Sequence, residues 1–402
     1  MSKRGSSGRS CLLAINKPLG MSSHDVVNVV RRVFNERRVG HAGTLDPQAS
    51  GVLLVCVGPA TRLDAFLVGH GKRYRMGVAF GVSTTTDDSE GEITKQLEVP
   101  ERIGDEQFAR NYLTQMIGEG MQVPPIYSAI KVKGKKAYEQ ARAGNVIDLA
   151  PRKFEIYDAQ LSEVRPCPLL DGSEGIEWIC DMSVSKGTYM RSIARDMGRD
   201  LGTCAYVSSL VRTISGSIML EDCLTLDQLE QNKEGALIDP LRALGLRFAF
   251  ARSCSDKVEN GSWLSDTDLT LNEPLLTELY APCTCTTGVI PSSKPPEPNE
   301  VVGVIVDNRL KALYEYKESE HRYVPRCVFS WQNCIKWTNH LTILFSRMLP
   351  VLLVCLMVFI LVINIFLIAL KKQLNITGEN LSPLPSISIL MKFSIQNVCV
   401  NL

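Results

Sequence analysis

Three stretches of the chain have the pattern of a helix. Residues 25–34 and 105–117 each bring apolar side chains to one face at helical spacing. A further helix is expected from about 189 to 201, with Thr188 at its N-cap. Thr225 begins a sequence with the form of a capping box, which predicts another short helix.

Strands are expected where apolar residues alternate with polar ones or run without interruption. Apolar residues occupy every second position from 176 to 184, which is typical of a half-buried strand. The run 52–57 has the length and the Val and Leu content of a strand buried on both faces. Residues 74–80 predict another strand, and 301–316 predict two strands joined by a turn at Asp307.

These elements interleave without a repeating βαβ unit, which favours an α+β architecture built on one mixed sheet. We expect a flexible basic N-terminus over 1–10, a main domain over 11–250 and a small β-rich region over 251–331. Ser and Pro residues predict an exposed loop near 286–300 within that region. Residues 332–402 form an atypical tail.

The tail contains 23 residues without a charge, from 348 to 370, with Lys371 and Lys372 after them. At about 1.5 Å per residue, such a helix would cross a hydrocarbon layer of about 30 Å. One interpretation is a transmembrane anchor, which would make membrane association possible through this segment only. The other is that the tail is a frameshift or readthrough product and was never selected.

Charge is distributed unevenly along the chain. The formal net charge is +1, but the first 80 residues carry twelve Lys and Arg against four acids. Clustered cations attract phosphate groups and are typical of nucleic-acid binding, although a solvated basic face would look the same.

The thirteen cysteines include no CxxC pair. Cys283 and Cys285 form an isolated CxC without partners at zinc spacing, so we expect no metal site. Because residues near the N-terminus lack the apolar stretch of a secretory signal, we expect no such signal and expect most cysteines to be reduced and buried.

The most informative stretch for chemistry is a glycine-punctuated loop, expected over Gly40–Gly51, that contains Asp46. Its glycines allow tight folding and the close approach of a ligand. Pro47 keeps Asp46 out of helical dihedral angles, so that the carboxylate projects from an extended loop. An Asp-Pro pair is usually only a turn, but this one precedes a buried strand in the most basic part of the chain.

The sequence from this loop to Leu63, GHAGTLDPQASGVLLVCVGPATRL, resembles the motif that holds the catalytic aspartate of TruB-type pseudouridine synthases. Six further segments resemble motifs of the same family in the same order. They are NKPLGMSSH at 16–24, KRYR at 72–75, TTTDDSEG at 84–91, QVPPIYSAIK at 122–131, ARAG at 141–144 and SKGTYMRS at 185–192. The resemblance covers roughly residues 12–215. It implies a mainly antiparallel central sheet flanked by helices.

The resemblance also implies a catalytic set. Asp46 would be the nucleophile, Arg191 would pair with it, and Tyr74 would stack against the target base. Pseudouridine formation breaks an N-glycosidic bond and rejoins the uracil through carbon, so neither a metal nor a cofactor is expected. An ionised carboxylate suits addition to sugar or base, and a nearby arginine keeps it ionised.

Eight further residues are candidates for binding the substrate. His41 would hold the flipped nucleotide, and Lys17, Arg62 and Lys131 would contact backbone phosphates. The other four match motif positions that line or support the pocket: Asp88, Tyr189, Leu210 and Arg212.

The function implied is isomerisation of the T-loop uridine at position 55 of tRNA, after base flipping, by a cytoplasmic enzyme that needs no protein partner. A tRNA-folding chaperone that acts by binding alone is an alternative. A second alternative is a guide-RNA-dependent pseudouridine synthase. An alternative location is the membrane, to which the tail would anchor the protein. Relatives of this family usually carry a C-terminal RNA-binding domain of the PUA type, and residues 236–331 keep only traces of one.

Overall fold

The computed structural model describes most of the chain up to Phe329. The described residues are 9–329 without 129, 133, 144–147, 234, 252, 275–289 and 308. The chain divides into two compact units after Trp337, and every described residue belongs to the first. The expected tail, its apolar segment 348–370 and the CxC pair lie outside the described residues. Within the described ranges, no helix has the length and apolar character needed to cross a membrane.

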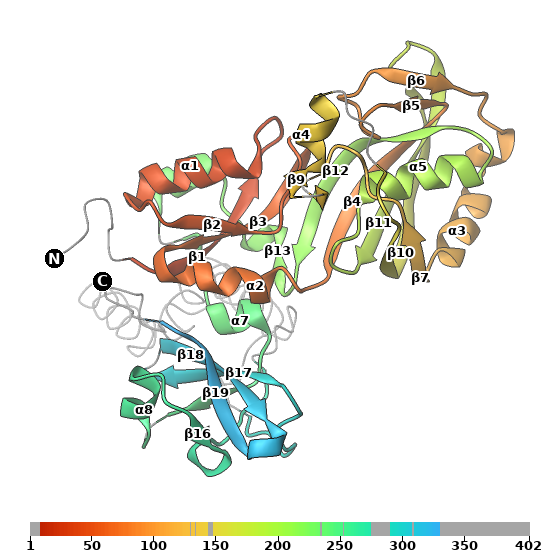
Figure 1. Cartoon of the computed structure of the whole chain (residues 1–402). Coiled ribbons are helices and arrows are strands. Elements are labelled where there is room, and N and C mark those ends of the chain that lie inside the picture. Colours follow the sequence, from red (N-terminus) through yellow and green to blue (C-terminus); the bar gives the residue numbers. More distant parts are fainter. Residues whose placement is uncertain are drawn as a thin grey trace, which may run out of the picture. The chain divides into compact units, whose positions relative to one another are not determined.

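A ten-stranded sheet forms the larger part of the structure (Figure 1). Its order is β14-β1-β3-β12-β4-β11-β10-β7, with β2 on β3 and β13 on β12. Every pairing is antiparallel except that of β3 with β12. The strands are β1 Cys11–Lys17, β2 Val39–Ala42, β3 Ala49–Val57, β4 Lys72–Phe80, β7 Gly118–Gln122, β10 Arg152–Pro168, β11 Glu174–Val184, β12 Ala205–Ser215, β13 Ile218–Met219 and β14 Leu237–Ile238.

The longer helices share a hydrophobic core with this sheet. The core joins apolar residues of α1, α3 and α5 to those of β1, β3, β4 and β11. Helix α1 begins at a capping box between Ser22 and Asp25, and it ends at Asn35, which adopts the left-handed conformation. The helices are α1 Ser23–Phe34, α2 Asp64–Leu67, α3 Glu106–Gln115, α4 Ala137–Arg142, α5 Met190–Asp200, α6 Leu226–Gln231, α7 Pro240–Leu244 and α8 Ser255–Glu259.

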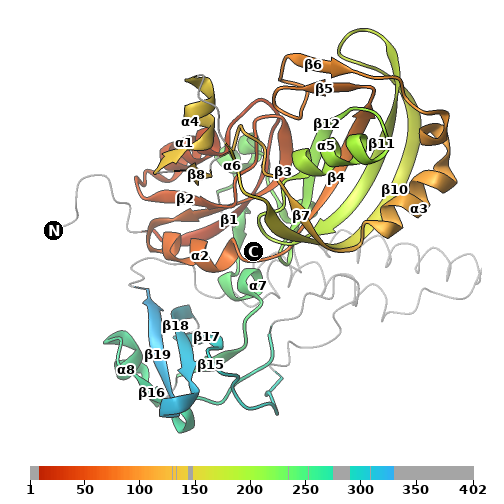
Figure 2. The ribbon, with the colours of Figure 1, turned by 45° about the vertical axis from the view of Figure 1, so that its right-hand side comes forward.

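A second sheet of five strands follows, in the order β15-β17-β18-β19-β16 (Figure 2). Only β15 and β17 pair in parallel. A hydrophobic cluster joins residues of this sheet, such as Phe248 and Leu313, to Leu12 and Leu54 of the large sheet. The strands are β15 Phe248–Phe250, β16 Leu264–Ser265, β17 Val301–Val306, β18 Arg309–Lys317 and β19 Arg322–Val328.

Short elements complete the fold. Two hairpins stand apart from both sheets and consist of β5 Val82–Thr84 with β6 Ile93–Gln96, and β8 Lys131–Val132 with β9 Lys135–Lys136. The 3-10 helices are η1 Gly58–Leu63, η2 Glu101–Gly104, η3 Leu220–Asp222, η4 Asp266–Asp268 and η5 Glu318–Glu320.

Most elements predicted from the hydrophobic pattern are confirmed, including the α+β class, β3, α3 and the capping box at Thr225. Two details were wrong. The expected Gly40–Gly51 loop is shorter, because residues 39–42 form β2 and pair with β3, which begins at Ala49. Thr188 is not the N-cap of α5. Its hydroxyl donates to the Ser185 carbonyl, and Tyr189 takes the cap position.

Candidate active site

The loop between β2 and β3, residues 43–48, carries Asp46 and is fixed at several points. The Leu45 backbone N–H donates to Ser23 Oγ at 2.8 Å, and Ser23 Oγ donates back to the Leu45 carbonyl at 2.9 Å. The Gly20 N–H donates to the Pro47 carbonyl at 2.9 Å. These bonds hold the backbone on both sides of Asp46, so the direction of its carboxylate is set by the start of α1 and the loop before it.

Arg212 of β12 supports the same loop from inside the protein and is only 1% exposed. Its Nε donates to the Val52 carbonyl at 2.7 Å, and its Nη2 donates to the Gly43 carbonyl at 3.2 Å. Gly51 lies against the Arg212 backbone, and a Cβ atom at position 51 would come within 2.2 Å of the Arg212 carbonyl oxygen. The parallel pairing of β3 with β12 therefore positions the loop.

Lys17 is fully buried, and its ammonium donates to the carbonyls of Pro18, Met21 and Pro47. Burial lowers its pKa to about 8, and the nearby Asp46 opposes that shift. The sequence predicted a phosphate contact for Lys17. In the structure this side chain joins the loop after β1 to the Asp46 loop.

Arg191 of α5 reaches Asp46, as the resemblance implied. Its Nη2 lies 2.9 Å from Asp46 Oδ2, and the side chains are 8% and 40% exposed respectively. The same Nη2 donates to the Tyr127 carbonyl at 2.9 Å, and Nη1 donates to the Thr86 carbonyl at 3.0 Å. The guanidinium is therefore buried and fixed, while the carboxylate remains open to a substrate.

A second carboxylate shares this arginine. Asp88 Oδ2 lies 3.5 Å from Arg191 Nη1, and the Asp88 side chain is 7% exposed. Asp88 Oδ1 accepts bonds from the Thr86 hydroxyl and the Glu90 N–H. Asp88 is thus part of the site, where it holds the turn after β5 against α5.

The surroundings of Asp46 favour its neutral, protonated form more than water does for an exposed aspartate. Burial is the largest influence and raises the pKa of Asp46, and the negative charges of Asp88 and Glu90 add to it. Arg191 opposes both effects through its charge and its hydrogen bond. The balance leaves the pKa above the usual value of 3.8.

Several other predicted residues lie on the strands around the loop. Tyr74 of β4 is buried and lies opposite Arg212 of the neighbouring strand β12. Leu210 of β12 lies opposite Ala49 of β3. His41 of β2 is partly buried, and this burial lowers its pKa and favours the neutral imidazole. Tyr189 is half-buried at the N-terminus of α5, and burial raises the pKa of its hydroxyl.

One predicted binding residue is not part of this arrangement, and a second cannot be placed in the described part of the chain. Arg62, in η1, donates to the Val328 carbonyl of β19 at 2.8 Å. Lys131 begins β8, but its side chain lies outside the described part of the chain.

The sequence prediction missed residues that hold the site together. Arg195 Nη1 lies 3.0 Å from Asp87 Oδ2, and its Nη2 donates to the Val123 carbonyl at 2.8 Å. The Gln122 side chain accepts the Tyr189 N–H at 2.8 Å. Arg195 follows Arg191 by one helical turn, and this spacing alone could have identified it.

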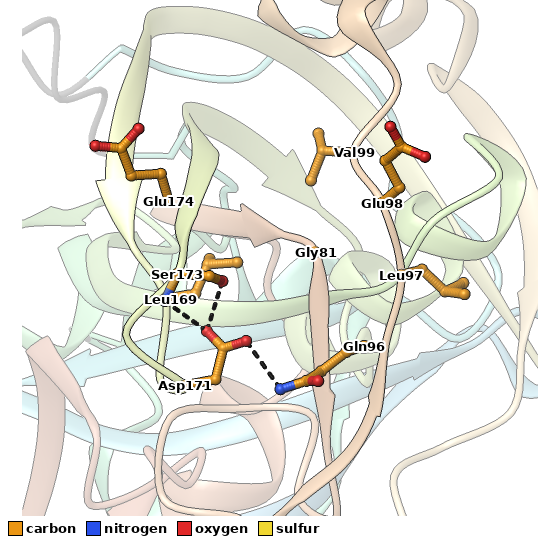
Figure 3. A pocket seen from close by; sticks show the side chains of 9 residues that line it. All are labelled: Gly81, Gln96, Leu97, Glu98, Val99, Leu169, Asp171, Ser173 and Glu174. Atoms are coloured by element: carbon orange, nitrogen blue, oxygen red, sulfur yellow. Dashed lines mark hydrogen bonds between the residues drawn. The ribbon is translucent and has the colours of Figure 1, made fainter.

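A cavity of about 450 Å³ lies at the far end of β4, beyond Phe80 (Figure 3). Carboxylate and apolar side chains line it, and Figure 3 shows Asp171 bonded to both Ser173 and Gln96. No lysine or arginine lines this cavity. It has neither the Asp46–Arg191 pair nor the charge that a phosphate requires. Among the described residues, no group of three or more His, Cys, Asp or Glu side chains could hold a metal ion.

Comparison with known proteins gives a consistent result. Residues 31–190 match the family described as TruB family pseudouridylate synthase (N terminal domain). Residues 191–244 match the tRNA pseudouridylate synthase B C-terminal domain. A protein named tRNA pseudouridine synthase B from Pediococcus pentosaceus is 36% identical over 78% of this chain and 97% of its own length. One of the same name from Alkaliphilus oremlandii is 40% identical over 66% of this chain and 86% of its own.

Solved structures share the fold at lower identity. A chain in the crystal structure of a Cbf5-Nop10-Gar1 complex has a TM-score of 0.54 at 22% identity, over 80% of this chain and 84% of that one. A chain in an H/ACA RNP bound to a substrate RNA has a TM-score of 0.55 at 21% identity, over 82% and 88%. These likenesses extend beyond residue 244, where the family matches end.

Proposed function

This chain belongs to the TruB family of pseudouridylate synthases, and on that premise we propose that it isomerises the T-loop uridine at position 55 of tRNA. The observation that carries the proposal is the pair of Asp46 Oδ2 and Arg191 Nη2 at 2.9 Å, in which the carboxylate is partly exposed and the arginine is buried. The relatives from Pediococcus pentosaceus and Alkaliphilus oremlandii are named for activity on tRNA, which supports the same substrate. We also propose that the reaction takes place in the cytoplasm and needs no protein partner.

The reaction proposed is an isomerisation that Asp46 begins as the nucleophile. The uridine leaves its stack, and the carboxylate adds to the sugar or the base. The bond from C1′ to N1 breaks, the uracil turns, C1′ joins C5, and the bond to Asp46 breaks so that the free carboxylate is restored. The C5 proton then leaves and N1 gains a proton, so that the product has the composition of the substrate. Arg191 keeps the carboxylate oriented, and we assign Tyr74 to stacking against the base.

The direct test is to incubate the full chain with an unmodified tRNA transcript and map pseudouridine by position. We expect one pseudouridine, at position 55 of the T-loop. A matched transcript with cytidine at that position should yield none. Product at a different position would exclude the assigned site, and no product from either transcript would remove the proposed activity.

The raised pKa of Asp46 predicts how activity depends on pH. Only the ionised carboxylate is a nucleophile, so kcat/KM should fall as the pH decreases through this pKa, above the value near 4 of an ordinary aspartate. Glu90 raises the pKa of Asp46, and Glu90→Gln should therefore move the acidic limb to lower pH. A pH–rate profile of both proteins, with circular dichroism to follow folding, measures this. A limb unchanged by Glu90→Gln would contradict the prediction.

A further inference from the structure

Gln122, the last residue of β7, is a buried side chain next to the active site whose amide uses only one of its two polar atoms. The residue is 2% exposed, and its Oε1 accepts the backbone N–H of Tyr189 at 2.8 Å. Since only the oxygen of an amide accepts a hydrogen bond, this contact fixes which way the amide points. The Nε2 group is left buried, and it finds no hydrogen-bond partner among the described residues.

The unused Nε2 group indicates what the side chain is for. A buried donor without a partner destabilises the folded protein. A methionine at position 122 would fill a similar space without bringing a donor that needs a partner. The bond to Tyr189 is therefore the contact that offsets the cost of the amide, and it depends on the oxygen alone.

The helix that receives this bond, α5, has no N-terminal cap of its own. Tyr189 occupies the N-cap position without a side-chain cap bond, and the first turn contains no acidic residue. In a capping box the residue at N3 would accept the N–H of the N-cap residue. Ser192 stands at N3 here, but its hydroxyl donates to the Val123 carbonyl at 2.9 Å. Gln122 supplies the missing acceptor from a different part of the chain.

The first turn of α5 carries side chains that meet at Asp46. Arg191 is the second residue of the helix, and its Nη2 lies 2.9 Å from Asp46 Oδ2. Burial is the largest influence that raises the pKa of the Tyr189 hydroxyl, and the charge of Asp46 adds to the rise, so these two groups are close enough to interact. A misplacement of about 1 Å in such a site can cost about 10²-fold in rate. The position of this turn therefore matters to the chemical step.

We propose that Gln122 is a positioning residue of the reaction: its side-chain oxygen fixes the first turn of α5 and thereby orients Tyr189 and Arg191 toward Asp46. The inference rests on the proposed function, because it takes Asp46 as the reacting group. Gln122 acts through α5 and is assigned no contact with the substrate. Its loss should therefore slow the chemical step and leave the affinity for tRNA unchanged.

The test compares Gln122→Met with Gln122→Glu in the full chain. Glutamate keeps an accepting oxygen in both protonation states, whereas methionine offers only a weakly accepting sulfur. Gln122→Met should lower the single-turnover rate of pseudouridine formation by about 10- to 100-fold with an unchanged Kd for tRNA, and Gln122→Glu should restore most of the rate. Each rate is taken on the plateau of the variant's own pH–rate profile, because the new carboxyl group adds a titrating charge. Total pseudouridine is counted, so the result does not depend on which uridine reacts.

The control is Asn272→Leu, which removes a buried amide of the second sheet that donates to the Phe248 carbonyl at 3.1 Å. It should lower the midpoint of thermal unfolding and keep the wild-type rate. Hydrogen exchange at the Tyr189 N–H, measured without tRNA, should be faster in Gln122→Met and not in Gln122→Glu.

Three results would overturn the assignment: a wild-type rate in Gln122→Met, an equal loss of rate in Gln122→Glu, or an equal loss in Asn272→Leu. A wild type that forms no pseudouridine would instead contradict the proposed function. Hydrogen exchange needs no turnover, so in that case it would still show whether Gln122 holds the start of α5.

Discussion

Asp46→Asn is expected to reduce kcat for pseudouridine formation by about 10⁴-fold or more, which is the scale on which enzymes lose activity without their nucleophile. Asparagine has nearly the same shape but is neutral at every pH, and its amide is a poor nucleophile. The Arg191 guanidinium would keep its contacts with the Thr86 and Tyr127 carbonyls and with Asp88. The rate of product formation in single-turnover reactions with tRNA measures the effect.

The fold and RNA binding should both survive this change. Because the pKa of Asp46 is raised in the folded protein, ionising it at neutral pH costs stability, and a neutral side chain removes that cost. The control is Glu90→Gln, which removes an exposed carboxylate that also acts on Asp46 and should keep activity at pH 7. Wild-type activity in Asp46→Asn would show that Asp46 is not the nucleophile. Product formation by the wild type that is lost in Asp46→Asn, with tRNA binding unchanged, would show that binding alone does not account for the activity on tRNA.

Gly51→Ala is expected to lower the stability of the protein by about 2–5 kcal/mol. Position 51 has a φ of +104°, and a methyl group there would lie 2.2 Å from the Arg212 carbonyl oxygen. Backbone strain at a positive φ contributes about 1–2 kcal/mol, and forced displacement of packed atoms contributes about 1–3 kcal/mol. For a domain of this size the midpoint of thermal unfolding should fall on the order of 5–15 °C.

Gly202→Ala separates the two contributions. Gly202 also has a positive φ, of +82°, but nothing lies within 4 Å of a Cβ atom at this position. It should therefore lose only the strain of about 1–2 kcal/mol. Thermal unfolding followed by circular dichroism compares the variants, and equal losses in both would show that contact with Arg212 is unimportant. Gly51→Ala should also reduce activity, since displacing β12 moves the arginine that holds the Asp46 loop.

The sequence was sufficient for much of the fold because its strongest signals are local. The uninterrupted apolar run of β3 and the alternation in β11 follow directly from burial on two faces or on one. The sequence predicts Thr188 as the N-cap of α5, because threonine is common at that position. In the structure Tyr189 is the N-cap, and its N–H donates to the side chain of Gln122, 67 residues away in sequence. No local sequence pattern contains that contact.

Site residues could be predicted from the sequence where a motif identifies them. The role of a residue could not be predicted where it depends on tertiary contacts. The motifs predict Asp46 and Arg191 as a pair, and the two side chains lie together. The sequence predicts a phosphate contact for Lys17, but its ammonium donates to backbone carbonyls of the loop after β1 and of the Asp46 loop. A buried lysine and a surface lysine look alike in a sequence, because burial depends on elements that arrive from distant positions.

The parallel pairing of β3 with β12 has a consequence for biosynthesis. The Asp46 loop is translated early. Arg212 of β12, which supports this loop, lies 160 residues after Val52, whose carbonyl accepts its hydrogen bond. Contacts so far apart in the chain form late, because a long segment must be ordered before they can close. A ribosome-bound fragment that ends before Ala205 would already contain the aspartate but would lack its support. Catalytic competence should therefore emerge only once β12 has left the ribosome, which keeps incomplete chains from acting on RNA.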